Sequence, residues 1–215
     1  MLEQFKGKLI ISCQALPDEP LHSPFIMGRM ALAAKQAGAV GIRAQGVEDI
    51  KEVKKVTGLP VIGLIKRNYD DSEIYITATK KEVEELLESG CEIIALDATL
   101  RKRPNDEKLE DLVKLIKDNG KIALADISND EEGIFAQKIG FDCVSTTLSG
   151  YTDYTPKLKG PDFGLVARMV DRLDIPVFAE GRINTPEDLK IAYECGAFCE
   201  NLAHRPYFPS GSPLQ

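Results

Sequence analysis

Charged and polar residues stand at the end of nearly every predicted strand in this chain. The clearest case is the apolar segment 60–65, which ends abruptly at Lys66. When parallel strands alternate with helices in a barrel, the carboxyl ends of the strands meet at one face, and that face carries the chemistry. The residues at these ends are Gln14, Arg43, Lys66, Asp97, Asp126, Thr147 and Glu180. Any one of them could simply begin a solvated loop, but the whole set in one register predicts a shared site.

The mixture of charges expected at this site suits proton transfer on carbon. The cations are Arg43, Lys66 and Arg182, and the carboxylates are Asp97, Asp126 and Glu180. Carboxylates alone would indicate a divalent metal, but a mixed site without histidine does not require one. A lysine that faces a glutamate across a pocket can move a proton on and off a carbon atom. The same lysine could form a Schiff base with a carbonyl substrate, so the residues leave both chemistries open.

The segment FAEGRINTPED, residues 178–188, resembles an anion-binding turn. Gly181 allows close approach of the backbone to a ligand. The helix expected to start at Asn184 and Thr185 offers free N–H groups to an anion. Barrels often bind phosphate after the seventh and eighth strands. A glycine before a helix is also ordinary turn chemistry, so this segment alone is a weak indication of a phosphate site.

The segment TTLSGYTDYT, residues 146–155, is rich in hydroxyl groups and precedes a fairly long loop. A long loop at the catalytic end of a barrel can close over the substrate or contact it. The alternative is a solvated loop without a role. By contrast, the segment YITATKKEV, residues 75–83, is typical of a helix start, with Thr77 or Thr79 as the N-cap.

The elements that must position these residues alternate regularly along the chain. One kind of strand follows a small-residue turn, and the turn glycines are Gly38, Gly90, Gly140 and Gly196. The other kind lies between them, at residues 9–16, 59–67, 121–128 and 175–183. Helical periodicity is clearest in residues 24–38, 46–58, 80–89, 108–120, 164–173 and 184–196. This order predicts parallel strands and right-handed crossovers, and hence an α/β fold of the (β/α)8 TIM-barrel type. A doubly wound sheet is the alternative.

Length and composition set the wider limits. The chain has 215 residues, 43% hydrophobic and 28% charged, which is ordinary for one globular domain. A formal net charge of −7 argues against nucleic acid as a partner. The N-terminus lacks the pattern of a signal peptide, and no apolar stretch reaches the length of a membrane helix. The odd number of cysteines, without metal-finger spacing, indicates reduced thiols in a cytoplasmic protein.

Eight motifs together resemble the N-acetylmannosamine-6-phosphate 2-epimerase family of bacterial sialic acid degradation. They are ISCQALPDEPL, GIRAQG, GLIKRNY, YITAT, ALDAT, LADIS, STTLSGYT and FAEGRINTPED, in the family's order from about residue 8 to residue 199. Single motifs such as LDAT would not be specific, but the whole series is.

The resemblance implies a barrel of the ribulose-phosphate-binding type and a homodimer. It implies an isomerase that interconverts N-acetylmannosamine 6-phosphate and N-acetylglucosamine 6-phosphate without a metal or a nucleotide. Lys66 then corresponds to the catalytic proton-transfer lysine and Glu180 to its acidic partner. The implied substrate contacts are Gln14, Arg43, Asp126 and Arg182, with Gly181 in the phosphate cradle; Thr147 is added from its place at a strand end.

The chain departs from the family pattern after residue 199. Glu200 and Asn201 interrupt the apolar run of the eighth strand, and prolines and serines follow instead of a glycine-rich loop and a helix. We therefore expect the eighth strand and the final helix to be atypical or missing. This divides the chain into a barrel epimerase domain, residues 1–199, and a divergent tail, residues 200–215. We interpret the tail as a truncation, a frameshift or an expression artefact.

Two alternatives to the epimerase follow from these features. The lysine at a strand end is also compatible with a Schiff-base aldolase acting on a phosphosugar. The altered C-terminus is compatible with a phosphosugar-binding protein that has lost catalysis.

Overall fold

A closed barrel of eight parallel strands forms the centre of the protein. The structure is a computed structural model that describes residues 1–203. Each strand pairs with its neighbours in chain order, and the last strand pairs with the first. The strands are β1 (Leu9–Cys13), β2 (Gly41–Gln45), β3 (Val61–Leu64), β4 (Ile93–Asp97), β5 (Ile122–Asp126), β6 (Cys143–Ser145), β7 (Val177–Glu180) and β8 (Cys199–Ala203). The TIM barrel predicted from the alternation of strands and helices is therefore confirmed.

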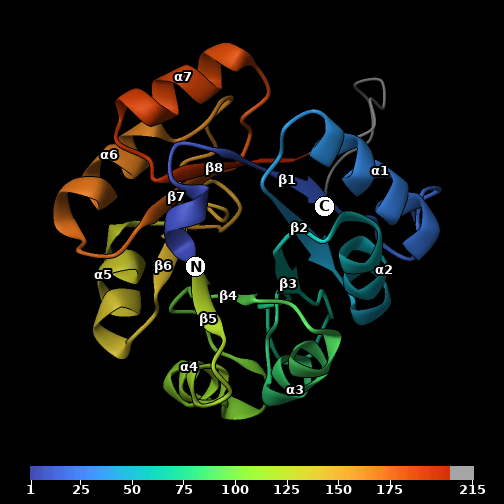
Figure 1. Ribbon diagram of the computed structural model, residues 1–215. Helices are drawn as coiled ribbons and strands as arrows, with labels where there is room; N and C mark the ends of the chain where they lie inside the picture. The colour runs from blue at the N-terminus through green and yellow to red at the C-terminus, as the bar shows by residue number, and fades with distance from the viewer. Residues whose placement is uncertain (204–215) are drawn as a thin grey trace.

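Helices form an outer ring around the strands (Figure 1). Those of the described part of the chain are α1 (Pro24–Gln36), α2 (Val47–Thr57), α3 (Lys80–Ser89), α4 (Leu109–Asp118), α5 (Asp130–Ile139), α6 (Phe163–Arg172) and α7 (Pro186–Glu194). Two short 3-10 helices, η1 (Leu2–Phe5) and η2 (Pro104–Asp106), complete the set. None of the helices within residues 1–203 is long and apolar enough to cross a membrane.

Helix α3 shows how local sequence defines an element. Of the two predicted caps, Thr79 is the N-cap, and it forms a capping box with Glu82. Gly90 follows the last helical residue as the C-cap, and its φ of 83° is the left-handed conformation that glycine adopts without strain. Val83 and Leu86 lie on its buried face. Both ends and the buried face therefore follow from residues near in sequence.

The expectation of an atypical or missing eighth strand is wrong. Strand β8 pairs in parallel with β7, where Asn201 lies opposite Glu180, and with β1, where Asn201 lies opposite Ile10. The two polar residues do not break the strand, because successive side chains of a strand point to opposite faces and the backbone is paired on both sides. Residues 200–203 therefore belong to the barrel. The prediction that the final helix is atypical or missing concerns residues 204–215, which lie outside the described residues.

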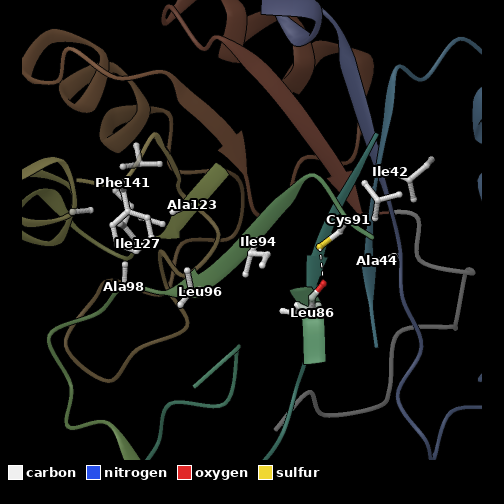
Figure 2. Close-up of a cluster of buried hydrophobic side chains, with 14 of the residues drawn as sticks. Ile42, Ala44, Leu86, Cys91, Ile94, Leu96, Ala98, Ala123, Ile127 and Phe141 are labelled. Atoms are coloured by element: carbon white, nitrogen blue, oxygen red, sulfur yellow. Dashed lines mark hydrogen bonds between the residues drawn. The ribbon is translucent and has the colours of Figure 1, made fainter. Parts of the chain in front are cut away.

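The hydrophobic core has two layers separated by the barrel wall. The outer layer packs the strands against the helices, and part of it is shown in Figure 2: Ile42, Ala44, Leu86, Cys91, Ile94, Leu96, Ala98, Ala123, Ile127 and Phe141. The inner layer fills the barrel: Phe5, Ile10, Ile62, Leu64, Ile76, Ile93, Ala95, Leu124, Cys143, Leu148, Phe178 and Cys199. All five cysteines of the chain have free thiols.

The N-terminal segment closes the amino end of the barrel. Phe5 of η1 is fully buried in the inner layer and meets Phe178 edge to face, with ring centroids 6.5 Å apart. Phe198 stacks on the same Phe178 ring at 6.1 Å. These aromatic contacts make the amino end of the barrel apolar. Because all eight strands are parallel, their polar carboxyl ends lie together at the opposite end.

Candidate active site

Arg43 is the central residue of the site. It lies on β2 and is 1% exposed. Its Nη1 and Nη2 donate hydrogen bonds to Oδ1 and Oδ2 of Asp126 at 3.1 and 2.6 Å. Nη1 also lies 3.3 Å from Oε2 of Glu180. Burial would lower the pKa of Arg43, but the two carboxylates keep it above its usual range. A buried charge must be paired, and the partners of Arg43 stand at the ends of β5 and β7. These ion pairs therefore connect β2 to both strands.

One oxygen of the Glu180 carboxylate, Oε2, has three contacts with neighbouring side chains. Besides Arg43, Ser145 Oγ donates to Oε2 at 3.0 Å and Asn201 Nδ2 donates to it at 2.9 Å. These three contacts from β2, β6 and β8 fix the position of Oε2. Burial raises the pKa of Glu180, while the charge of Arg43 opposes this rise and that of Asp126 adds to it. A glutamate whose neutral form is favoured by burial suits a group that gains and loses a proton.

Thr147 links the two carboxylates of the site. Its Oγ1 donates to Oδ1 of Asp126 at 2.7 Å and lies 2.8 Å from Oγ of Ser145. Ser145 in turn contacts Glu180. A chain of hydroxyl groups from β6 therefore runs between Asp126 on β5 and Glu180 on β7.

Lys66 follows β3 in a short antiparallel pairing with residues 75–77. Lys66 forms a bridge with Ile76, and the Thr77 N–H donates to the Ile65 carbonyl at 2.7 Å. Thr77 has a φ of 43°, which is strained for a residue with a branched side chain. Alternation along the chain puts Lys66 on the same face as Leu64, which lines the barrel interior. The pairing thus fixes the backbone from which the lysine extends.

The neighbouring cation, Arg67, serves a different purpose. Its guanidinium forms ion pairs with Glu82 and Glu85 of α3, the second at 3.1 Å. Glu82 is fully buried and also caps α3. Arg67 therefore anchors the strand end to the helix ring.

Gln14 follows β1 beside the central cluster. Its Nε2 donates to Ser12 Oγ at 2.7 Å, and Ser12 lies opposite Arg43 in the pairing of β1 with β2. Its Oε1 is buried without a hydrogen-bond partner among the described residues. The loop beyond is tied to β2, because Gln45 Nε2 donates to the Ala15 carbonyl at 3.1 Å. Gln14 is thus positioned to accept a hydrogen bond from a ligand.

Arg182 joins the turn after β7 to the segment 146–160. Its Nε donates to the Gly160 carbonyl at 2.8 Å and its Nη1 to the Ser149 carbonyl at 2.8 Å. Its guanidinium lies over the Tyr151 ring, 5.3 Å from the centroid. The adjacent Gly181 has a φ of 104°, which requires glycine. Among the described residues, these contacts of Arg182 are to neutral groups, so its charge is available to an anion.

The start of α7 differs from the sequence-based expectation. The N–H groups of Asn184 and Thr185 are not free, because both donate to Oδ2 of Asp188, at 2.9 and 3.0 Å. Asp188 and Thr185 form a capping box. The two N–H groups that were expected to bind an anion are therefore already satisfied within the helix turn.

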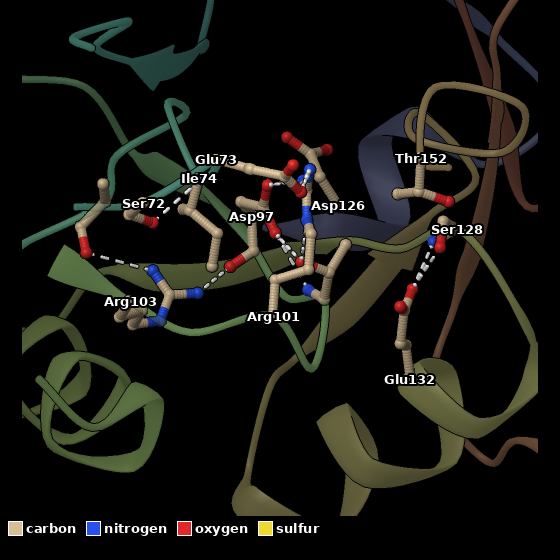
Figure 3. A network of polar contacts seen from close by, with 12 residues as sticks. Ser72, Glu73, Ile74, Asp97, Arg101, Arg103, Asp126, Ser128, Glu132 and Thr152 are labelled. Atoms are coloured by element: carbon tan, nitrogen blue, oxygen red, sulfur yellow. Dashed lines mark hydrogen bonds and ion pairs between the residues drawn. The ribbon is translucent and has the colours of Figure 1, made fainter. Parts of the chain in front are cut away.

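Asp97 ends β4 but is fully engaged in supporting the next loop (Figure 3). Its Oδ1 accepts from the N–H and the Oγ1 of Thr99 at 2.9 and 2.6 Å, and its Oδ2 accepts from Arg101 Nη2 at 2.8 Å. Arg103, 5% exposed, donates to the carbonyls of Asp97 and Ala78. Asp97 is thus a loop anchor next to the site. In residues 1–203 no group of three or more His, Cys, Asp or Glu side chains is arranged to hold a metal ion.

The structure brings some of the predicted residues together and adds two that sequence reasoning missed. Arg43, Asp126, Thr147 and Glu180 form one hydrogen-bonded cluster. Gln14 lies beside this cluster, while Gly181 and Arg182 are in the adjoining turn. Ser145 and Asn201 were not predicted. Ser145 shares a strand face with Thr147, so alternation could have identified it. Asn201 was mistaken for a break in β8.

A family model, curated relatives and a solved structure that match this chain all carry the same epimerase name. A family model described as "Putative N-acetylmannosamine-6-phosphate epimerase" matches residues 27–203. A Clostridioides difficile (strain 630) protein named "Putative N-acetylmannosamine-6-phosphate 2-epimerase" is 69% identical over 196 residues, 91% of this chain and 88% of that protein. A Clostridium perfringens (strain SM101) protein of the same name is 65% identical over 198 residues, 92% of this chain and 90% of that protein. A solved structure of the N-acetylmannosamine-6-phosphate 2-epimerase from Clostridium perfringens matches with a TM-score of 0.94 and 64% identity, covering 94% of this chain and 89% of that chain.

Proposed function

The chain belongs to the N-acetylmannosamine-6-phosphate epimerase family, and from this we propose that it interconverts N-acetylmannosamine 6-phosphate and N-acetylglucosamine 6-phosphate. The observation that carries the proposal is the 69% identity to a relative of that name. The buried cluster of Arg43, Asp126 and Glu180 at the carboxyl ends of the strands supports it, because these ends are where TIM barrels perform catalysis.

The two sugars differ only in configuration at C2, so the reaction must break and remake one C–H bond. In the open-chain form the C1 aldehyde acidifies the C2 proton. A base removes this proton and leaves an enolate whose negative charge lies on the C1 oxygen. A second group then delivers a proton to the opposite face of C2. Positive charges near C1 stabilise the enolate between the two steps.

We assign the two proton transfers to Lys66 and Glu180. Glu180 is suited to this because Arg43, Ser145 and Asn201 hold its Oε2 in one orientation. In this proposal the other oxygen, Oε1, exchanges the proton with C2. Lys66 extends from the end of β3 and acts on the opposite face.

The remaining predicted residues bind the substrate in this proposal. Gln14 accepts a hydrogen bond through its unpartnered Oε1, and Arg43 stabilises the enolate charge. Asp126 and Thr147 hold Arg43 and the hydroxyl chain in place and contact the sugar hydroxyls. The phosphate lies at Gly181 and Arg182, whose guanidinium meets only neutral groups in the described part of the chain.

We further propose that the protein is a homodimeric isomerase of the cytoplasm that acts in sialic acid degradation and needs no metal or cofactor. The family name supports the reaction class, and the free thiols are compatible with a reducing compartment. Light scattering coupled to size-exclusion chromatography tests the dimer.

The deciding experiment is proton NMR in D2O with N-acetylmannosamine 6-phosphate and a catalytic amount of the full chain. We expect N-acetylglucosamine 6-phosphate to appear with deuterium at C2. Lys66→Met should abolish both conversion and exchange, whereas Lys51→Met, at an exposed lysine of α2, should leave both unchanged. Absence of conversion and exchange with the wild-type chain would refute the proposal. Borohydride trapping of a substrate adduct on Lys66 would instead indicate a Schiff-base aldolase.

A further inference from the structure

Asn201 lies directly against the proposed proton-transfer glutamate. It is on β8, opposite Glu180 in the pairing of β7 with β8, and is 2% exposed. Its Nδ2 donates to Glu180 Oε2 at 2.9 Å. The polar residue that seemed to interrupt the strand therefore reaches the centre of the site.

Half of the Asn201 amide, its Oδ1, is buried without a hydrogen-bond partner among the described residues. An unpaired buried acceptor costs free energy that an apolar side chain of similar size would not. The preceding inner-face residue of the same strand, Cys199, packs in the apolar inner core. Packing in the apolar inner core therefore does not account for an amide here, whereas the contact with Glu180 does.

Counting hydroxyl hydrogens shows why the amide matters. Three contacts run from Asp126 through Thr147 and Ser145 to Glu180. A hydroxyl has one hydrogen to donate, so the two hydroxyls supply two hydrogens for three contacts. Because Thr147 donates to Asp126, the single hydrogen of Ser145 is shared between two acceptors, Thr147 Oγ1 and Glu180 Oε2. The Asn201 N–H and the Arg43 guanidinium are the donors to Oε2 that do not depend on the direction of that hydrogen.

We propose that Asn201 is a positioning residue of the active site, whose amide fixes the orientation of the Glu180 carboxylate and stabilises its ionised form. The inference rests on the proposed epimerase function for its effect on turnover. Its effect on Glu180 itself does not depend on that function.

The groups around Glu180 determine how its pKa responds when the Asn201 amide is removed. Burial favours the neutral acid, as does the charge of Asp126. The charge of Arg43 and the hydroxyl groups of Thr147 and Ser145 oppose both effects. The nearby Cys199 thiol is neutral, because burial raises its pKa. A donor to the ionised form lowers a carboxyl pKa, so removing the Asn201 N–H should raise the pKa of Glu180 further.

The test compares Asn201→Leu with wild type and with Glu200→Gln. Leucine matches asparagine in size but donates no hydrogen bond. Glu200 is the next residue on β8 and points to the opposite face, so its substitution controls for changes in the strand itself. Epimerisation rates are measured across pH, and thermal unfolding confirms that each variant folds.

We expect Asn201→Leu to lower kcat about tenfold with a smaller change in KM, because a hydrogen bond to a charged group is lost. The limb of the pH profile that reports Glu180 should move up by about one pH unit. Glu200→Gln should change neither value. A folded Asn201→Leu protein with the wild-type kcat and pH profile would overturn the proposal.

A second measurement separates this proposal from the function. Carboxyl 13C NMR of glutamate-labelled protein follows the ionisation of Glu180 directly, with Glu180→Gln to assign the signal. If wild type shows no epimerisation, the proposed function fails, but a higher pKa of Glu180 in Asn201→Leu still supports the contact. An unchanged titration would refute the role of Asn201 whether or not the enzyme turns over.

Discussion

Glu200 allows a prediction about stability whose size follows from the structure. It lies on β8 and is fully buried between the barrel wall and the helices. Neither carboxylate oxygen has a hydrogen-bond partner among the described residues. Burial, reinforced by the charge of Asp188, raises the pKa of Glu200 to about 8. The group is therefore neutral in the folded protein at neutral pH and ionised in the unfolded chain.

The sign and the size of the effect follow from this difference. Because folding raises the pKa of this carboxyl group, ionisation favours the unfolded chain. The free energy of unfolding therefore falls as pH rises from the unfolded pKa, about 4.3, to the folded pKa. Each pH unit in this window is worth about 1.4 kcal/mol. The loss is roughly 3 to 5 kcal/mol, where the lower figure allows for relaxation around the charge. This is a large part of the stability of an ordinary domain, about 5 to 15 kcal/mol.

The assay is urea unfolding of wild type and Glu200→Gln at about pH 5 and about pH 9. Glutamine keeps the shape and cannot ionise, so other titrating groups affect both proteins alike. Near pH 5 the two proteins should differ by about 1 kcal/mol or less, and near pH 9 the variant should be more stable by roughly 3 kcal/mol or more. Equal pH dependence in the two proteins would show that the carboxyl is solvated or paired, and the reasoning from burial would be refuted.

Three further predictions concern the site, the barrel wall and a helix start. Arg43→Lys should lower kcat/KM by roughly two orders of magnitude in the NMR assay, because lysine cannot reproduce the bidentate contact with Asp126; near-normal activity would argue against a role for that geometry. Gly63→Ala should cost about 1 to 3 kcal/mol in urea unfolding, because its methyl group would lie 2.8 Å from Cys91 Sγ, while activity per folded molecule is kept. Asp188→Ala should cost about 1 kcal/mol by removing the carboxylate half of the capping box of α7, while the N-cap Thr185 is kept. Hydrogen bonds from the backbone lower the pKa of Asp188, so its contribution should fade in acid, which unfolding at low pH would show.

Much of the fold and the identity of the strand-end residues could be predicted from local patterns. Alternating strands and helices predict the barrel, because parallel neighbours need helical crossovers. The glycine turns and the Thr79 cap follow from backbone rules that act within a few residues. Lys66 and Glu180 were identified because each ends an apolar strand. These features depend on the chain's own periodicity, so sequence reasoning can find them.

The partners of those residues were decided by the tertiary structure. Nothing near Arg43 in sequence indicates that it binds Asp126 and Glu180, which come from other strands. The N–H groups at the start of α7 were expected to be free, but Asp188 satisfies them. The eighth strand was wrongly predicted to be atypical or missing, because Glu200 and Asn201 follow each other in sequence and interrupt its apolar run. In the barrel its faces separate, so that Asn201 meets Glu180 while Glu200 is buried on the other side. The sequence by itself thus determined which side chains stand at the strand ends, and only closure of the barrel, which brings distant strands within hydrogen-bond distance, decided which of them pair.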